Sequence, residues 1–152
     1  MVFMILIGAS CFTGVFLGMG GVSIVTDFIL ALNLGKWGTY FIMMLTLLIL
    51  GCFIDWIAIL LICFPIFLPL ADKFGFDKLW FLIIMAVNLQ ASFLTPPFGY
   101  ALFYLRGTSP PEIQTSSIYR GVVPFVIIIC IGIIICTIFP QTILFLPSLI
   151  VK

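Results

Sequence analysis

The sequence predicts an all-α integral membrane protein whose transmembrane helices include a re-entrant helical hairpin and a broken helix. Three observations lead to this fold class. Hydrophobic residues make up 64% of the chain, charged residues make up 7%, and the mean hydropathy is +1.44, which leaves too little polar surface for a soluble domain. The apolar stretch 39–71 is too long for one crossing, and a second apolar stretch is interrupted at residues 95–99. We expect one membrane domain over residues 1–152.

Charge and cysteine content exclude several classes of function. The formal net charge is +1, and the charged residues lie almost entirely in short connections, so we expect no nucleic-acid partner. The five cysteines lie in apolar runs without C-x-x-C spacing, and the chain has no histidine, so we expect no zinc site. The sequence also lacks a nucleotide-binding glycine motif and a catalytic triad. We therefore expect neither a cofactor nor an enzymatic activity.

The first two predicted elements differ in their polar pattern. Residues 2–19 are apolar and long enough to span or nearly span the membrane, so we expect a transmembrane helix there. A pair of glycines ends it. Residues 22–34 then place Ser23 and Asp27 on one side of a helical wheel and mainly apolar residues on the other. This pattern is typical of an arm helix that lies in the interface and contacts membrane lipid.

The stretch 39–71 holds one ionisable side chain, Asp55, near its middle, with Gly51 one helical turn earlier. As one straight helix it would be about 50 Å long, well beyond a hydrocarbon core of about 30 Å. Dividing it between these two residues gives arms of roughly 12 and 16 residues, each shorter than the ~20 needed to cross. We therefore predict a re-entrant hairpin whose tip, residues 51–55, stops inside the membrane. The alternative is one long, tilted or kinked helix in which Asp55 is hydrogen-bonded to a neighbour.

Residues 79–106 form a second apolar stretch, which we expect to cross the membrane once as a broken helix. Pro96 and Pro97 stand side by side within it, and adjacent prolines cannot continue a regular helix. The helix is therefore predicted to unwind over residues 95–99. After a polar connection, residues 121–139 are predicted to form a plain, isoleucine-rich transmembrane helix.

A polar stripe leads into this break. Asn88, Ser92 and Thr95 are spaced i, i+4 and i+7, so they share one face of an otherwise apolar helix. Their side chains and the carbonyls freed by unwinding converge on one spot, so Asn88 and Ser92 are candidates to face a substrate. The alternative is interhelical hydrogen bonding, which is common in membrane bundles and could alone account for the stripe.

Two interrupted elements in one membrane chain are typical of a secondary transporter that holds an ion and its substrate near the membrane midplane. An aspartate at that depth is costly, so its presence favours a functional role with a cation nearby. Sodium prefers oxygen ligands, which unwound backbone and polar side chains supply. We therefore predict a site for a coupling sodium ion and no other metal. The candidate ion-binding residues are Gly51, Asp55, Thr95, Pro96 and Gly99.

The same residues carry a family resemblance. The chain contains, in order, G-x-x-x-D at 51–55, P-x-x-x-P at 65–69, N-L at 88–89 and T-P-P-x-G at 95–99. This combination resembles the C-terminal half of the large membrane subunit (DctM type) of the tripartite ATP-independent periplasmic (TRAP) transporters, over nearly the whole chain. The resemblance implies one repeat of an inverted-repeat elevator transporter. It also implies that residues 51–55 are the outer hairpin tip and residues 95–99 the broken helix around the second sodium site.

Function and partners also follow from the resemblance. It implies a sodium-coupled permease that imports organic acids such as dicarboxylates, as a multi-pass protein of the bacterial inner membrane. It further implies a small TRAP membrane subunit and a periplasmic substrate-binding protein as partners. Family members carry an N-terminal repeat with a second hairpin and a second broken helix, which is missing from this sequence. We therefore expect the chain to be a fragment of the large subunit that cannot transport alone.

Two functions of other classes stay open at this point. An intramembrane enzyme could use Asp55 as an acid or base, although no second membrane aspartate, histidine or serine motif accompanies it. A structural or assembly subunit without its own transport site would instead predict that Asp55 and residues 95–99 are freely replaceable.

Overall fold

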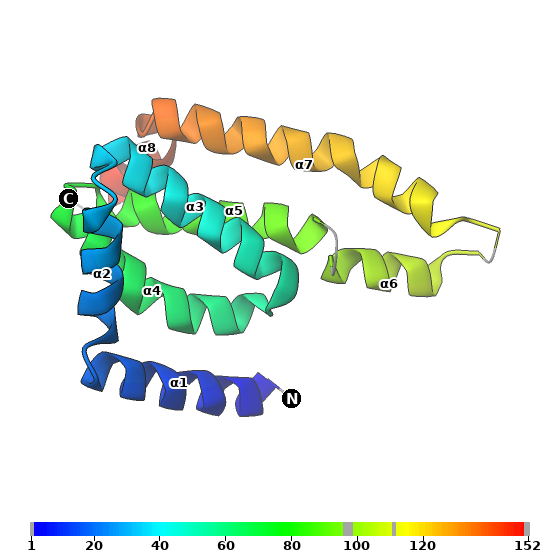
Figure 1. Cartoon of the computed structure of the whole chain (residues 1–152). Helices are drawn as coiled ribbons and strands as arrows, with labels where there is room; N and C mark the ends of the chain where they lie inside the picture. Colours follow the sequence, from blue (N-terminus) through cyan, green and yellow to red (C-terminus); the bar gives the residue numbers. More distant parts are fainter. Residues whose placement is uncertain (1, 96–98, 111, 151–152) are drawn as a thin grey trace.

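The described part of the chain is helical throughout. The structure is a computed structural model that describes residues 2–95, 99–110 and 112–150, and within these ranges the elements are eight α-helices without a strand. Figure 1 shows them in chain order. Their bounds are α1 Val2–Gly18, α2 Gly21–Ala31, α3 Gly35–Phe53, α4 Trp56–Lys73, α5 Lys78–Leu94, α6 Tyr100–Thr108, α7 Thr115–Ile138 and α8 Gln141–Ile150. The predicted all-α fold class is confirmed.

Several of these helices are suited to a membrane. By length and composition, α3, α4 and α7 could each cross it, and α1 with α2 forms a further candidate that is bent by 70°. Gly20 stands at this bend with φ 76°, a left-handed conformation that glycine adopts without strain. The stretches 2–19 and 22–34, which were predicted as a transmembrane helix and an arm, therefore correspond to two helices that meet at a sharp angle.

α3 and α4 form a helical hairpin whose tip consists of Ile54 and Asp55 (Figure 1). The arms have 19 and 18 residues, or about 28 and 27 Å, and so exceed the lengths predicted from the sequence. α3 is longer because it begins at Gly35, ahead of the predicted stretch, and because it continues through Gly51 to Phe53. The break is therefore narrower than the predicted tip.

Contacts at the open end of the hairpin explain the early start of α3. Lys36 Nζ donates a hydrogen bond to Gly75 O at 3.0 Å and lies 4.5 Å from the centroid of the Phe76 ring. The Trp37 ring lies 5.9 Å from the rings of both Tyr40 and Phe76. These contacts hold the first turn of α3 against the connection that follows α4.

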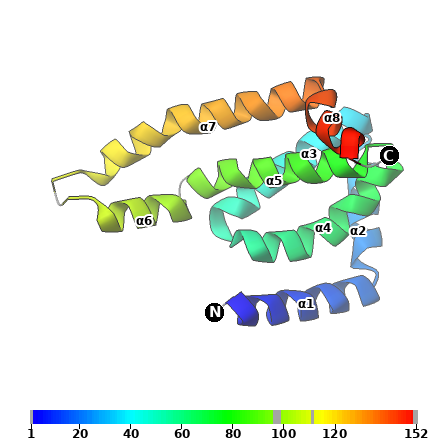
Figure 2. The same ribbon diagram turned by 180° about the vertical axis from the view of Figure 1, so that it is seen from behind.

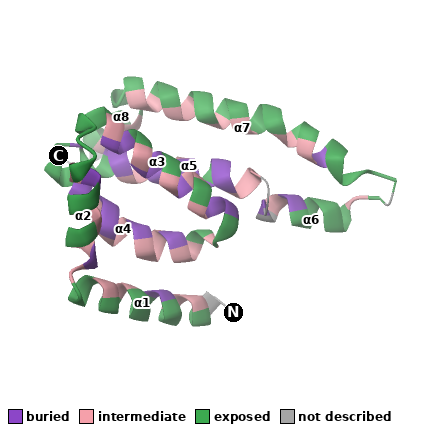
Figure 3. Cartoon of the chain, in the orientation of Figure 1, coloured by how far each residue is buried: buried purple, intermediate pink, exposed green. Residues whose placement is uncertain are grey.

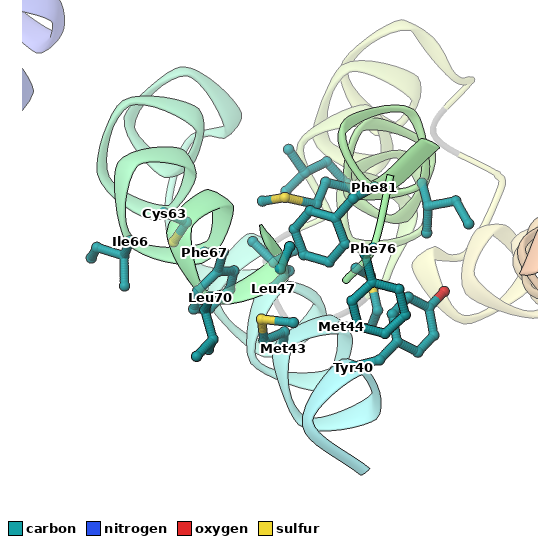
Figure 4. Close-up of a cluster of buried hydrophobic side chains, with 14 of the residues drawn as sticks. Tyr40, Met43, Met44, Leu47, Cys63, Ile66, Phe67, Leu70, Phe76 and Phe81 are labelled. Carbon is teal, nitrogen blue, oxygen red and sulfur yellow. The ribbon is translucent and has the colours of Figure 1, made fainter. Parts of the chain in front are cut away.

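α5 is the central helix of the fold. It packs against α3 and α4 on one side and against α7 on the other (Figure 2). Figure 4 shows the side chains where the hairpin meets α5, among them Met43, Leu47, Leu70 and Phe81, each at most 1% exposed. Because lipid tails are as apolar as these side chains, their packing stabilises the fold through close van der Waals contact more than through removal of water.

α7 packs against α5 and α6, and most of its surface is exposed. Near its C-terminus, the Tyr40 hydroxyl is hydrogen-bonded to Thr137 Oγ1 at 2.8 Å, and Trp80 Nε1 donates to Cys136 O at 3.0 Å. Elsewhere its isoleucine-rich surface is largely exposed (Figure 3). Such a surface suits a helix that faces lipid or further membrane helices.

α7 also begins earlier than predicted, at Thr115 rather than at the start of the stretch 121–139. Gln114 precedes it in an extended conformation with ψ 141°, and Gln114 O accepts a hydrogen bond from Ser117 N at 3.0 Å. Serine and threonine are well tolerated at helix starts. Part of the polar connection is therefore the first turn of a helix.

The predicted break in the stretch 79–106 is present. α5 ends at Leu94 and α6 begins at Tyr100, on the two sides of the adjacent prolines. In both views α6 continues beyond the hairpin tip (Figures 1 and 2), and its nine residues extend for about 13 Å. The tip thus ends short of the level that α6 reaches. Because α3 and α4 are each long and apolar enough to cross a membrane, whether the hairpin is re-entrant stays a prediction.

Candidate functional site

The last turns of α3 and α5 lie directly against each other. Gly51 in α3 and Ser92 in α5 are both buried, and a Cβ added at Gly51 would lie 2.5 Å from Ser92 Cβ and closer still to Ser92 Oγ. A helix can approach this closely only where a side chain is absent. Because α3 and α5 run in the same direction (Figure 1), this contact places their C-terminal ends side by side.

Two neighbouring helix C-termini create an environment that favours a cation. Each such end carries about half a negative charge, contributed by its last carbonyl groups. One of these ends borders the hairpin tip, and the other borders the break after α5. Carbonyl oxygens at the ends of broken membrane helices are the ligands that secondary transporters use for sodium.

Asp55 lies at the hairpin tip as the N-cap of α4. Its backbone is extended, with φ −62° and ψ 141°, and Asp55 Oδ2 accepts a hydrogen bond from Ile57 N at 3.3 Å. The half-buried carboxylate therefore stabilises the positive end of the α4 dipole. A carboxylate has two oxygens with several lone pairs, so this capping bond leaves it able to bind a cation as well.

Thr95 and Gly99 lie at the two ends of the break. Thr95 ends α5 in an extended conformation, with φ −88° and ψ 132°, and its Oγ1 donates to Ala91 O at 2.7 Å. Gly99 precedes α6 with φ 41°, which is a left-handed conformation and therefore favours glycine. The predicted ligand Pro96 lies outside the described residues. The structure thus brings the Thr95 end of the break and the hairpin tip to the same end of the core.

Asn88 and Ser92, the predicted substrate-facing residues, are 5% and 0% exposed. Asn88 Nδ2 donates to Met44 O of α3 at 2.8 Å, and Ser92 Oγ donates to Leu89 O of its own helix at 2.9 Å. The Asn88 bond joins α5 to α3, as in the alternative of interhelical hydrogen bonding, whereas the Ser92 bond stays within α5. A role of either residue toward a substrate stays a prediction.

Sequence reasoning missed the contact that organises the site. The sequence places Gly51 at the start of the predicted hairpin tip, whereas in the structure Gly51 continues α3 and allows the close approach of Ser92. Small residues in two apolar membrane helices are the signal for such an approach. That signal was present, since glycine and serine each interrupt a run of larger side chains.

An open apolar groove of about 490 Å³ lies beside the tip, between α4, α5 and α7. It is lined by Trp56, Leu60, Ala86, Leu89, Gln90, Phe93, Leu94 and Ile129. Gln90 contributes the one amide among these side chains, so the groove offers little to a carboxylate or a sodium ion. The paired helix ends are therefore the better candidate for an ion site.

Comparison with known proteins decides the family. The family described as "Tripartite ATP-independent periplasmic transporter, DctM component" matches residues 1–142. The chain belongs to the DctM family. This confirms the predicted resemblance, and the relatives of the chain are named as transporter permeases rather than as enzymes. Together with the helices that could span a membrane, family membership also makes the chain part of a multi-pass membrane protein.

Relatives of this DctM-family chain are several times longer. The sialic acid TRAP transporter permease protein SiaT of Haemophilus influenzae is 36% identical to this chain over 105 residues, which are 69% of this chain and 17% of the relative. The C4-dicarboxylate TRAP transporter large permease protein DctM of Pseudomonas aeruginosa is 32% identical to this chain over 124 residues, which are 82% of this chain and 29% of the relative. The isethionate TRAP transporter permease protein DctMQ of Oleidesulfovibrio alaskensis is 38% identical to this chain over 94 residues, which are 62% of this chain and 14% of the relative. The chain therefore spans less than a third of the length of these relatives.

Proposed function

We propose that this chain is part of the membrane permease of a sodium-coupled secondary transporter that imports organic acids. Membership of the DctM family supports the transport role. The relatives carry the names of sialic acid, C4-dicarboxylate, isethionate and 2,3-diketo-L-gulonate. These compounds share an acidic group, and so the substrate class is an organic anion, with dicarboxylates as one example.

The main support for sodium coupling is the contact between Gly51 and Ser92, which places the C-terminal ends of α3 and α5 side by side. Asp55 at the tip adds a full negative charge, and Thr95 adds a hydroxyl oxygen at the start of the break. An organic anion would be repelled from this end of the core unless a cation were bound there. Binding of sodium and binding of the substrate therefore favour each other.

The complete site requires more chain than the described helices. We propose that an N-terminal repeat of the same large permease completes it, and that a small membrane subunit and a periplasmic substrate-binding protein act with it at the bacterial inner membrane. The greater length of the relatives supports the first part of this proposal, because it leaves room for a second hairpin and a second broken helix.

The test is uptake of radiolabelled acids by cells that express the complete permease, the small subunit and the binding protein. Sialic acid, a C4-dicarboxylate, isethionate and a neutral sugar are offered in sodium buffer and in choline buffer. We expect uptake of at least one acid, in sodium buffer alone, with cells that lack the permease as the control. Uptake that is equal in choline buffer would contradict sodium coupling, and uptake of the sugar alone would contradict the substrate class.

A further inference from the structure

One hydrogen bond joins α1 to the second arm of the hairpin. Thr13 Oγ1, in α1, donates to the backbone oxygen of Leu61, in α4, at 3.1 Å. Within the described residues α1 packs mainly against α4, and its buried Ala9 lies one turn before Thr13. This bond therefore lies where the first helix meets the hairpin.

The acceptor is a carbonyl that α4 cannot satisfy by itself. In an α-helix, the carbonyl of each residue accepts from the N–H four residues later. The residue four positions after Leu61 is Pro65, which lies inside α4 and has no N–H. Because α4 is apolar enough to cross a membrane, lipid surroundings offer no water to replace the missing donor. The Thr13 hydroxyl supplies that donor.

Thr13 differs in this respect from other hydroxyl side chains in the protein. Serine and threonine in helices commonly donate to a carbonyl three or four residues earlier in the same helix. Ser92, Thr95 and Thr137 each do so. Thr13 instead donates to a neighbouring helix, at a carbonyl that a proline has left open.

We propose that Thr13 is a positioning residue that fixes where α1 packs along α4. Apolar contact between membrane helices has little directional preference, so it permits sliding and rotation, whereas a hydrogen bond to a single open carbonyl specifies one position. Pro65 creates the acceptor and Thr13 occupies it. Because α1 continues through the bend into α2, the bond also sets where the arm helix begins. This inference concerns helix packing and is independent of the sodium proposal.

The test is a double-mutant cycle on the full chain in detergent, with the unfolding equilibrium constant measured by titration with SDS. Thr13→Val keeps the shape of the side chain and removes the hydroxyl, while Pro65→Ala restores an N–H that can satisfy Leu61 O. We expect Thr13→Val alone to raise the unfolding constant about threefold to twentyfold, as found for hydrogen bonds between membrane helices. With Pro65→Ala present, the same change should have less than about a twofold effect. An equal effect in both backgrounds would overturn the proposal.

Two further variants serve as controls. Pro69→Ala restores an N–H one turn later in α4 and leaves the Leu61 carbonyl open, so Thr13→Val should keep its full effect in that background. Thr13→Ser retains the hydroxyl and should behave like the original chain. A Thr13→Ser variant that is as destabilised as Thr13→Val would show that a hydroxyl at this position does not restore the contact, and would overturn the proposal.

A second measurement, which does not use the Pro65 variant, reads the position of α1 directly. Spin labels are attached at Met4 and Lys73, which are both exposed, in a background whose native cysteines are replaced. The distance distribution between the labels should stay narrow in the Thr13→Ser variant and should broaden or shift in Thr13→Val. An unchanged distribution in Thr13→Val would show that the hydroxyl does not position α1.

Discussion

Replacing Gly51 by alanine tests the close approach of α3 and α5. The added Cβ would lie 2.5 Å from Ser92 Cβ, whereas carbon atoms normally approach no closer than about 3.5 Å. Both Cβ atoms are bonded to the backbone, so rotation of the Ser92 side chain cannot relieve the clash, and the helices must separate by about 1 Å. Overpacking of this kind costs typically about 1–3 kcal/mol, which corresponds to a rise of about fivefold to 150-fold in the unfolding equilibrium constant.

The assay is SDS-induced unfolding of the full chain in detergent. Ser92→Gly removes the side-chain atoms that the new Cβ would meet, so Gly51→Ala should cost little in the Ser92→Gly background. Gly132→Ala in α7 is the matched control, because a Cβ there meets nothing within 4 Å; it should leave stability unchanged or slightly raised. If Gly51→Ala unfolds at the same SDS concentration as the original chain, the proposed contact between the two helix ends is absent.

Two further predictions concern the hairpin and its contact with α5. The first uses a complete permease whose native cysteines are replaced, with single cysteines introduced and treated with an impermeant thiol reagent. Cysteines at Leu34 and Lys73 should be labelled from one side of the membrane and a cysteine at Thr108 from the other. Ile54→Cys, at the hairpin tip, should react more slowly than Thr108→Cys. Equally fast reaction of these last two from the same side would show that both hairpin arms cross the membrane. The second concerns Asn88. Asn88→Leu removes a buried hydrogen bond to α3 and should lower the free energy of unfolding by about 0.6–1.7 kcal/mol. Asn88→Asp places a carboxylate against a carbonyl and should lower the free energy of unfolding further. Unfolding curves of both variants that overlay the original curve would show that this side chain does not join the two helices.

The breaks in the fold were predictable from local chemistry. Adjacent prolines cannot continue a helix, and α5 accordingly ends one residue before Thr95. Asp55 is a candidate because an ionisable side chain in the middle of a long apolar stretch is costly and therefore favours a function. In the structure its carboxylate caps α4, and this cap is compatible with the predicted role in ion binding.

The features that the sequence did not reveal depend on contacts between distant residues. The glycine-containing segment before residue 39 looks like a turn, but Lys36 and Trp37 contact the connection after α4 and so extend α3 to Gly35. Helical spacing placed Asn88 and Ser92 on one face, but it could not tell which neighbour that face meets. Likewise, the role of Thr13 depends on a carbonyl 48 positions away.

We propose that a sodium ion binds where the hairpin tip meets the broken helix. The most direct test of this claim is the sodium concentration that gives half-maximal uptake by the complete permease carrying Asp55→Asn or Thr95→Val, with the abundance of each variant in the membrane measured alongside. Loss of one oxygen ligand, valued at about 1.5–3 kcal/mol like a hydrogen bond to a charged group, should raise this concentration about tenfold to hundredfold without much loss of protein. An unaltered sodium dependence in both variants would contradict the claim and remove these residues from the site.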